Sequence, residues 1–150
     1  MYRTILVPVD GSKRAEAIFR HVKNLARGND ATVVLLKVEE EPINLEHDEI
    51  IDIEKYRQEY RNLVRRSTTY LEALQDQLGA TGIRAVPRLA YGSVVKTILT
   101  VAAETGADLI ALATHGLGGL PRVSYGSVAA GVLQAADIPI LLIRSCNDKK

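Results

Sequence analysis

The feature that most constrains the fold is a regular alternation of short apolar runs with amphipathic segments of helical period. The clearest apolar run is Val33-Val34-Leu35-Leu36, inside a predicted strand from Ala31 to Val38. A strand that is apolar at every position is typical of a sheet with helices on both faces. The alternation therefore predicts a parallel sheet with right-handed crossovers.

The same reading gives approximate bounds for each element. Strands are predicted over residues 3–9, 31–38, 83–90, 108–113 and 138–143. Helices are predicted from Ser12 to a stop at Gly28, from about Glu49 to Leu78, from Gly92-Ser93 to Gly106, and from the glycine-rich loop through Ala136. Arg84, Pro87 and Arg88 interrupt the third strand, which suits an edge position.

Two turns rich in glycine and hydroxyl residues follow predicted strands. Asp10-Gly11-Ser12 follows the first strand, and the segment from Gly116 to Ser127 follows the fourth. In open α/β sheets, ligands bind beyond the carboxyl ends of strands whose helices go to opposite faces. Placing strands 1 and 4 side by side brings the two turns together. We therefore predict a doubly wound five-stranded parallel sheet of order 3-2-1-4-5.

Composition narrows the class of protein. The chain has 150 residues, 47% hydrophobic and 25% charged, with a net charge of +1, which fits one globular domain over residues 1–150. The charge gives no electrostatic argument for nucleic acid. Because no apolar run is long enough for a secretory signal or a membrane span, we expect a cytoplasmic protein with no membrane partner. The single cysteine, Cys146, excludes an intramolecular disulfide and a four-cysteine metal site.

The stretch from Thr114 to Val128 is the strongest functional signal. It places Gly116, Gly119 and Gly126-Ser127 between a strand and a helix. Glycine lets phosphate oxygens approach backbone N–H groups, and a helix N-terminus favours anions. A plain flexible connection is the competing interpretation. The segment is neither a Walker A loop, since it has no Gly-Lys-Ser/Thr ending, nor a Rossmann fingerprint, since Pro121 replaces the third glycine.

Asp10 and His115 flank this predicted crevice. Asp10 is open to two interpretations: a turn or helix-capping residue, or a carboxylate that binds a ribose hydroxyl or holds Mg²⁺ beside phosphates. For His115 we favour a structural role, or a role as hydrogen-bond donor to phosphate, over a role as general base. Glutamates 39–41 are predicted to be a solvated loop, and Tyr56, Tyr60 and Tyr70 to be packing or interface residues.

These residues resemble the universal stress protein family over nearly the whole chain. The matching segments are 5–12, 107–110, 114–116, 126–128 and 138–143. The resemblance implies a doubly wound α/β fold, usually a homodimer, with a Gly-x2-Gly-x9-Gly-Ser/Thr pattern in the ATP-binding branch. Gly116, nine further residues and Gly126-Ser127 match the second half of that pattern, and Ala113 replaces its first glycine. Alanine suits a strand-like φ there and disfavours a positive φ.

The resemblance also implies roles for individual residues. Asp10 would contact ribose or metal, Val38 would present backbone to adenine, and the glycine loop with Ser127 and Val128 would surround the phosphates. The crevice would be lined by Pro8, Val9 and Leu112. The complete set of candidate nucleotide-binding residues is Pro8, Val9, Asp10, Ser12, Val38, Leu112, Ala113, His115, Gly116, Gly119, Gly126, Ser127 and Val128.

The last predicted strand suggests a partner. Residues 138–143 are uncharged, and such a strand at a sheet edge is an open template unless it pairs with its symmetry mate. We therefore expect a homodimeric stress-response regulator that binds ATP, with Mg²⁺, and signals to a protein partner. No nucleophile and base are assembled, so at most slow ATP hydrolysis is expected. A nucleotide-independent interaction module is the alternative, and the lack of a Gly-x-Ser-x-Gly elbow disfavours a hydrolase.

Overall fold

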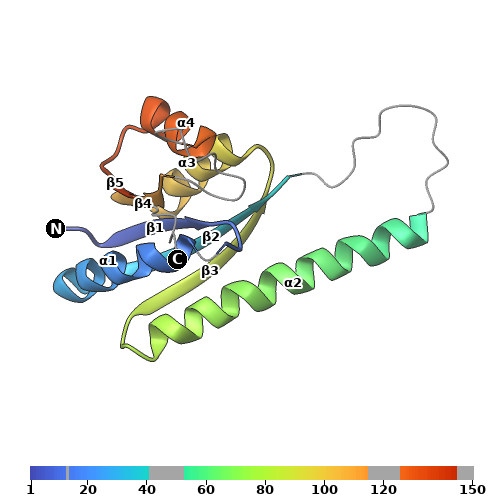
Figure 1. Ribbon diagram of the computed structural model, residues 1–150, viewed down its shortest axis with the longest axis horizontal. Helices are drawn as coiled ribbons and strands as arrows, with labels where there is room; N and C mark the ends of the chain where they lie inside the picture. Colours follow the sequence, from blue (N-terminus) through green and yellow to red (C-terminus); the bar gives the residue numbers. More distant parts are fainter. Residues whose placement is uncertain (13, 41–52, 115–125, 145–150) are drawn as a thin grey trace, which may run out of the picture.

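The computed structural model describes residues 1–12, 14–40, 53–114 and 126–144 of the chain. Strands and helices alternate along it, as Figure 1 shows. The elements are β1 (Thr4–Val9), α1 (Arg14–Asn29), β2 (Thr32–Glu39), α2 (Ile53–Gly79), β3 (Arg84–Tyr91), α3 (Val94–Thr105), β4 (Leu109–Ala113), α4 (Ser127–Ala135) and β5 (Ile140–Ile143).

The strands form one five-stranded parallel sheet in the order β3-β2-β1-β4-β5, which confirms the predicted order. β1 lies at the centre, where Ile5 is in register with Val33 of β2 and Leu109 of β4. β3 and β5 are the two edges. The predicted edge position of the third strand, which carries Pro87, is therefore confirmed.

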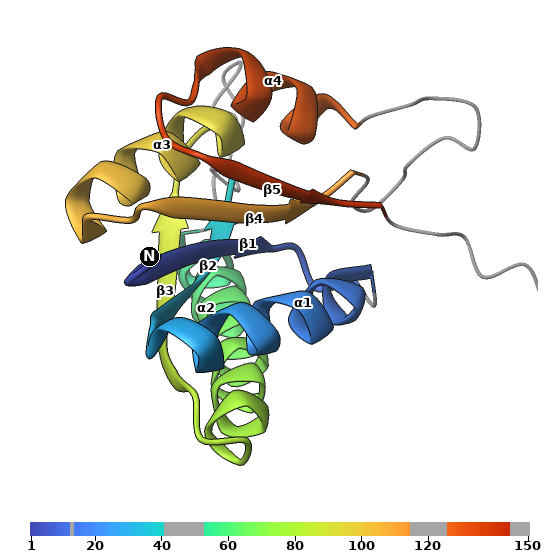
Figure 2. The same ribbon diagram turned by 90° about the vertical axis from the view of Figure 1, so that its left-hand side faces the viewer.

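Helices cover both faces of the sheet, α1 and α2 on one and α3 and α4 on the other (Figure 2). The strands divide their side chains between the two cores, because successive residues of a strand point to opposite faces. In β1, Ile5 and Val7 pack under α1 and α2, whereas Leu6 packs under α3 and α4. The continuous apolar run of β2 is buried on both sides for the same reason.

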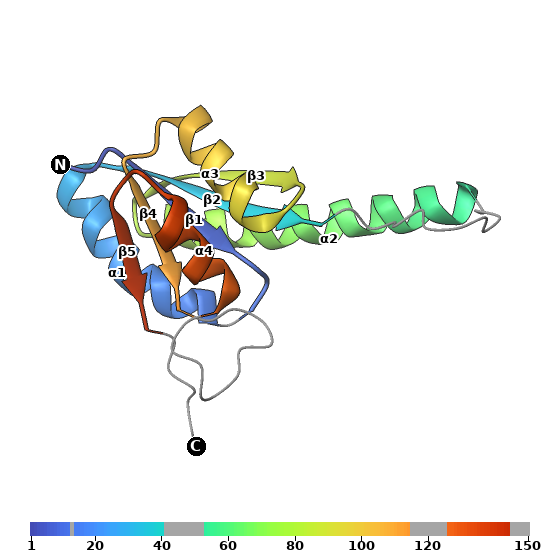
Figure 3. The same ribbon diagram turned by 90° about the horizontal axis from the view of Figure 1, so that it is seen from above.

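α2 is much longer than the sheet it covers. Its buried residues are Ser67, Leu71, Leu74 and Leu78, all in its second half. The first half extends past the ends of the strands, as Figures 1 and 3 show. No helix in the described part of the chain has the length and apolar content needed to span a membrane.

Several observed boundaries differ from the predicted ones by one or two residues. α1 continues through Gly28 to Asn29, and the chain turns instead at Asp30, which has φ 52°. At this additional residue, the Asn29 side-chain amide donates to the Leu25 carbonyl at 2.9 Å. β5 begins at Ile140 rather than at residue 138. The predicted start of α2 at Glu49 lies outside the described residues.

Candidate functional site

The candidate site lies where β1 and β4 run side by side. From the carboxyl end of β1 the chain enters α1 on one face, and α4, which follows β4, lies on the other face (Figure 2). This divergence of neighbouring strands opens the crevice in which ligands of doubly wound sheets bind. The predicted switch point is therefore present.

The turn after β1 lies on one side of this switch point. Gly11 has φ +86°, a backbone conformation that residues other than glycine rarely adopt. The Ser12 backbone N–H donates to Asp10 Oδ1 at 2.9 Å, so the aspartate stabilises its own turn. The turn role considered for Asp10 is thus observed, and it leaves this half-buried carboxylate at the carboxyl end of β1.

The end of β4 and the start of α4 lie on the other side. Thr114 is buried, and its N–H donates to the Ile143 carbonyl at 3.0 Å. The Gly126 N–H donates to the Thr114 carbonyl at 2.6 Å, which brings the first turn of α4 back to the end of β4. The first helical bond of α4 runs from Ala130 N–H to the Gly126 carbonyl at 3.0 Å. The N–H groups of Ser127 and Val128 precede it, and helices offer no internal acceptor for such groups.

Alanine suits the backbone at position 113. Ala113 is the last residue of β4 and is in register with Ile143 of β5. Among the described residues, Asp30 is the one non-glycine residue with a positive φ. Ala113 therefore meets the condition under which alanine can replace the first glycine of the pattern without backbone strain.

Four further candidate residues lie on β1, β2 and β4. Val9 and Leu112 are buried in opposite cores, at 6% and 4% exposure, so their side chains are not free to line a ligand. Val38 lies on β2, next to β1, and packs toward α3. Pro8 is half-buried in β1. His115, Gly116 and Gly119 lie outside the described residues.

Glu39 does not belong to a solvated loop, so that prediction is wrong. It is the last residue of β2, and its Oε1 accepts hydrogen bonds from Lys37 Nζ and, at 2.7 Å, from the buried Ser67 Oγ. Burial raises the pKa of Glu39, but these hydrogen bonds and the charges of Lys37 and Arg66 outweigh it, and the net pKa is lowered. The sequence signal that could have placed Glu39 in β2 was the continuation of the strand pattern one residue past Val38.

Tyr60 and Tyr91 form an aromatic contact between α2 and the end of β3. Their ring centroids are 5.9 Å apart with an interplanar angle of 27°. Burial, a hydrogen bond to Tyr60 and nearby negative charge raise the pKa of Tyr91 to about 12. The predicted packing role is confirmed for Tyr60, and for Tyr70, which packs against the core under α1 and α2.

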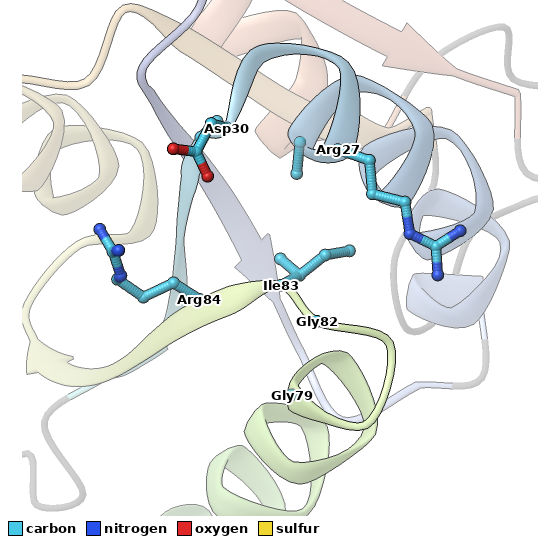
Figure 4. Close-up of a pocket in the computed structure, with 8 residues that line it drawn as sticks. Arg27, Asp30, Gly79, Gly82, Ile83 and Arg84 are labelled. Carbon is cyan, nitrogen blue, oxygen red and sulfur yellow. The ribbon is translucent and has the colours of Figure 1, made fainter.

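A cavity of about 500 Å³ lies at the other end of the sheet, where β2 and β3 begin. Arg27, Asp30 and Arg84 surround it, and Figure 4 shows the two guanidinium groups pointing away from each other. Arg27 instead donates to the Thr81 carbonyl at 3.3 Å. The arginines therefore do not converge on a ligand. No cluster of histidine, cysteine or carboxylate residues suited to a metal occurs in the described part of the chain.

The fold and the switch-point crevice define a doubly wound α/β protein with its candidate site at the start of α4. The chain belongs to the universal stress protein family, whose sequence model matches residues 1–144. It is 26% identical to universal stress protein MJ0577 of Methanocaldococcus jannaschii, over 98% of each chain.

Solved structures agree with this assignment. The structure of MJ0577 superposes with a TM-score of 0.83 over 99% of each chain, at 28% identity. Universal stress protein UspA of Lactobacillus plantarum gives 0.81 at 25% identity, over 95% of this chain and 98% of that one. Two further structures share the fold at 21% identity: a universal stress protein in complex with cAMP (TM-score 0.70, covering 97% and 98%) and one from Archaeoglobus fulgidus in complex with dAMP (0.66, covering 95% and 98%).

Proposed function

We propose that this chain, as a single domain over residues 1–150, binds ATP with Mg²⁺ in the crevice between β1 and β4. It would act as a nucleotide-dependent homodimeric regulator of a stress response, located in the cytoplasm. The observation that carries the proposal is the bond from Gly126 N–H to the Thr114 carbonyl. This bond sets the first turn of α4 at the end of β4, across the crevice from the Asp10 turn.

The residues divide between the two ends of an adenylate. The N–H groups of Ser127 and Val128 would bind the phosphates, with Gly116 and Gly119 of the preceding loop and the donor His115. Asp10 would accept from a ribose hydroxyl or from the hydration shell of Mg²⁺, which prefers carboxylate oxygen. Val38 would present backbone to the adenine. When bound, Mg²⁺ neutralises phosphate charge.

The complexes of two relatives with cAMP and dAMP support an adenylate rather than another anion, since those proteins share this fold. In this chain, the extended conformation at Ala113 supports the same site, because a strained alanine there would have argued against it. ATP bound at this site would change the surface offered to a protein partner.

Calorimetry of ATP and Mg²⁺ against protein stripped of carried-over nucleotide tests the proposal. We expect binding in the intact chain and a loss of about tenfold or more in Gly126→Val, because the isopropyl group would obstruct phosphate at the first turn of α4. Gly28→Val is the matched control, since a Cβ there meets nothing within 4 Å. Absence of heat at millimolar ATP would refute the proposal, as would unchanged binding in Gly126→Val.

The alternative is an interaction module that does not need a nucleotide. It is favoured by β5, whose apolar edge requires no ligand to associate. It predicts that Gly126→Val keeps both the dimer and the cellular function. The nucleotide-dependent proposal predicts that the variant keeps the dimer but loses the cellular function, so an assay of cellular function separates the two.

A further inference from the structure

α2 carries its charges in two opposite blocks. Its first half, residues 53–66, has five basic and two acidic side chains, a net charge of +3 in a chain whose total is +1. Its second half, residues 67–79, has Glu72 and Asp76 and no basic residue, a net charge of −2. We call these the basic half and the acidic half of α2.

This order of charges works against the helix itself. Arg57, Arg61 and Arg65 follow one another at four-residue spacing, as do Glu72 and Asp76, and like charges at this spacing repel. The acidic half also opposes the helix dipole, because Asp76 lies near the carboxyl end of α2 and the last turn has no basic residue. The ion pair within the basic half, Arg57 to Glu54 at 3.8 Å, is largely exposed. A helix with no partner would be more stable with the blocks exchanged.

The two blocks share one exposed face. At 100° per residue, Arg61, Arg65, Glu72 and Asp76 fall on a single side of α2, away from the buried stripe of Ser67, Leu71, Leu74 and Leu78. Gln75 Nε2 donates to the Ala85 carbonyl at 2.9 Å, which orients this face past the outer edge of β3. The face is therefore open to another molecule.

A shallow groove of about 400 Å³ lies on the same face. Its lining is Tyr60, Arg61, Val64, Arg65, Thr68 and Thr69. The threonines at its end are small and exposed, and they stand where the basic half meets the acidic half. A second helix can approach closely at this point.

We propose that this face binds the same face of a second copy of the chain, antiparallel, about a two-fold axis between Thr68 and Thr69. Arg65 and Glu72 lie equally far from that axis, as do Arg61 and Asp76. The axis therefore sets Arg65 against the partner's Glu72 and Arg61 against the partner's Asp76, each pair occurring twice. In the antiparallel pair, attractions between the two helices offset the repulsions within each helix. The two helix dipoles also point in opposite directions, which is favourable.

This contact is independent of the proposed nucleotide site and of the β5 edge. α2 packs against β2 and β3, whereas β5 lies at the other edge of the sheet. A chain that uses both edges would assemble beyond a dimer, into a closed tetramer or an open array. Because exposed ion pairs are individually weak, the contact is of low affinity and sensitive to salt. A nucleic acid or an acidic protein bound by the basic half alone would not need Glu72 and Asp76.

Site-specific cross-linking of the full chain tests the proposal. In a Cys146→Ser background, Thr69→Cys places one thiol beside the axis, and a short bismaleimide should link two copies at low salt. The yield should fall severalfold in 0.5 M salt. Lys96→Cys, exposed on α3, is the matched control and should cross-link far less.

Charge reversal decides whether the acidic half is the partner of the basic half. Arg61→Glu with Arg65→Glu should reduce cross-linking at Thr69→Cys by about tenfold, the size expected for losing several exposed ion pairs, and so should Glu72→Arg with Asp76→Arg. All four changes together should restore it. The proposal is overturned if reversal of either half leaves cross-linking unchanged, or if the fourfold variant, shown by circular dichroism to be folded, does not recover it.

Discussion

The two edges of the sheet are built in opposite ways. On β3, the Ala85 carbonyl accepts from Gln75, so the odd-numbered residues of this strand direct their backbone groups outward. Pro87 is one of them, and it has no N–H to offer there. Arg88, next to it, pairs with Glu104. Three features thus protect the outer edge of β3 from pairing with another strand: the Gln75 side chain, Pro87 and the charged pair of Arg88 with Glu104.

β5 has none of these devices. The carbonyls of Pro139 and Ile143 accept from β4, at Ile110 and Thr114. Strand alternation therefore directs the backbone groups of Ile140 and Leu142 away from β4, toward the open edge. All four residues of β5 are apolar. The difference teaches that strand pairing between chains has one suitable edge, and it is the basis for proposing the homodimer through residues 138–143.

The largest predicted effect follows from placing a charge on the open edge. Leu142→Arg should weaken the proposed dimer by more than about 30-fold, because an unpaired guanidinium would be buried where two β5 strands meet. Sedimentation equilibrium at several protein concentrations measures the change.

The matched control places the same charge on the closed edge. Val86 of β3 is 46% exposed, so Val86→Arg should leave the association constant unchanged. If Val86→Arg dissociates the dimer and Leu142→Arg does not, the two edges have been assigned the wrong way round.

The fold could be predicted because each element carries its own signal. The apolar run of β2 required helices on both faces, and Pro87 with its neighbouring arginines placed β3 at an edge. The end of α1 coincides with a side-chain contact that forms only in the folded chain. Gly28 suggested a helix end, but the bond from Asn29 to the Leu25 carbonyl carries the helix past it.

The candidate site could be predicted as a place but not in its details. Spacing brought the Asp10 turn and the start of α4 to one crevice, since both follow neighbouring strands. It could not tell that Val9 and Leu112 are buried in the cores, or that Ala113 is in an extended conformation. Those facts depend on strand register, and the sequence pattern leaves register open by a residue.

A second prediction concerns acid, which should loosen the β3 side of the sheet before the β5 side. The pKa of Glu39 is lowered in the folded chain by Lys37 and Ser67, in spite of burial. Its contribution to stability is therefore present above its unfolded pKa of about 4.3 and is lost as pH falls through the folded value. Glu39→Gln should lower the free energy of unfolding by about 1 kcal/mol at pH 7, and by progressively less as pH falls through the folded pKa of Glu39.

Urea unfolding of both proteins across this pH range measures the difference. Glu40→Gln, at the exposed position next to Glu39, is the control and should change the free energy of unfolding by less than about 0.5 kcal/mol. Hydrogen exchange should show amides of β2 and β3 losing protection first. A difference between Glu39→Gln and the parent chain that does not shrink as pH falls would mean that the glutamate acts through packing rather than charge.

The smallest predicted effect concerns the Arg88–Glu104 ion pair. It tests whether this pair only discourages strand pairing at the β3 edge or also stabilises the fold. Arg88 and Glu104 are 38% and 49% exposed, so water screens their ion pair. Arg88→Ala should lower the free energy of unfolding by less than about 0.5 kcal/mol, as for other exposed pairs. Urea unfolding gives this value, and sedimentation should show unchanged association, because Pro87 still withholds its N–H from an incoming strand. A loss above about 2 kcal/mol would show that the pair holds α3 to β3, and the charge on this edge would then have a structural origin rather than a protective one.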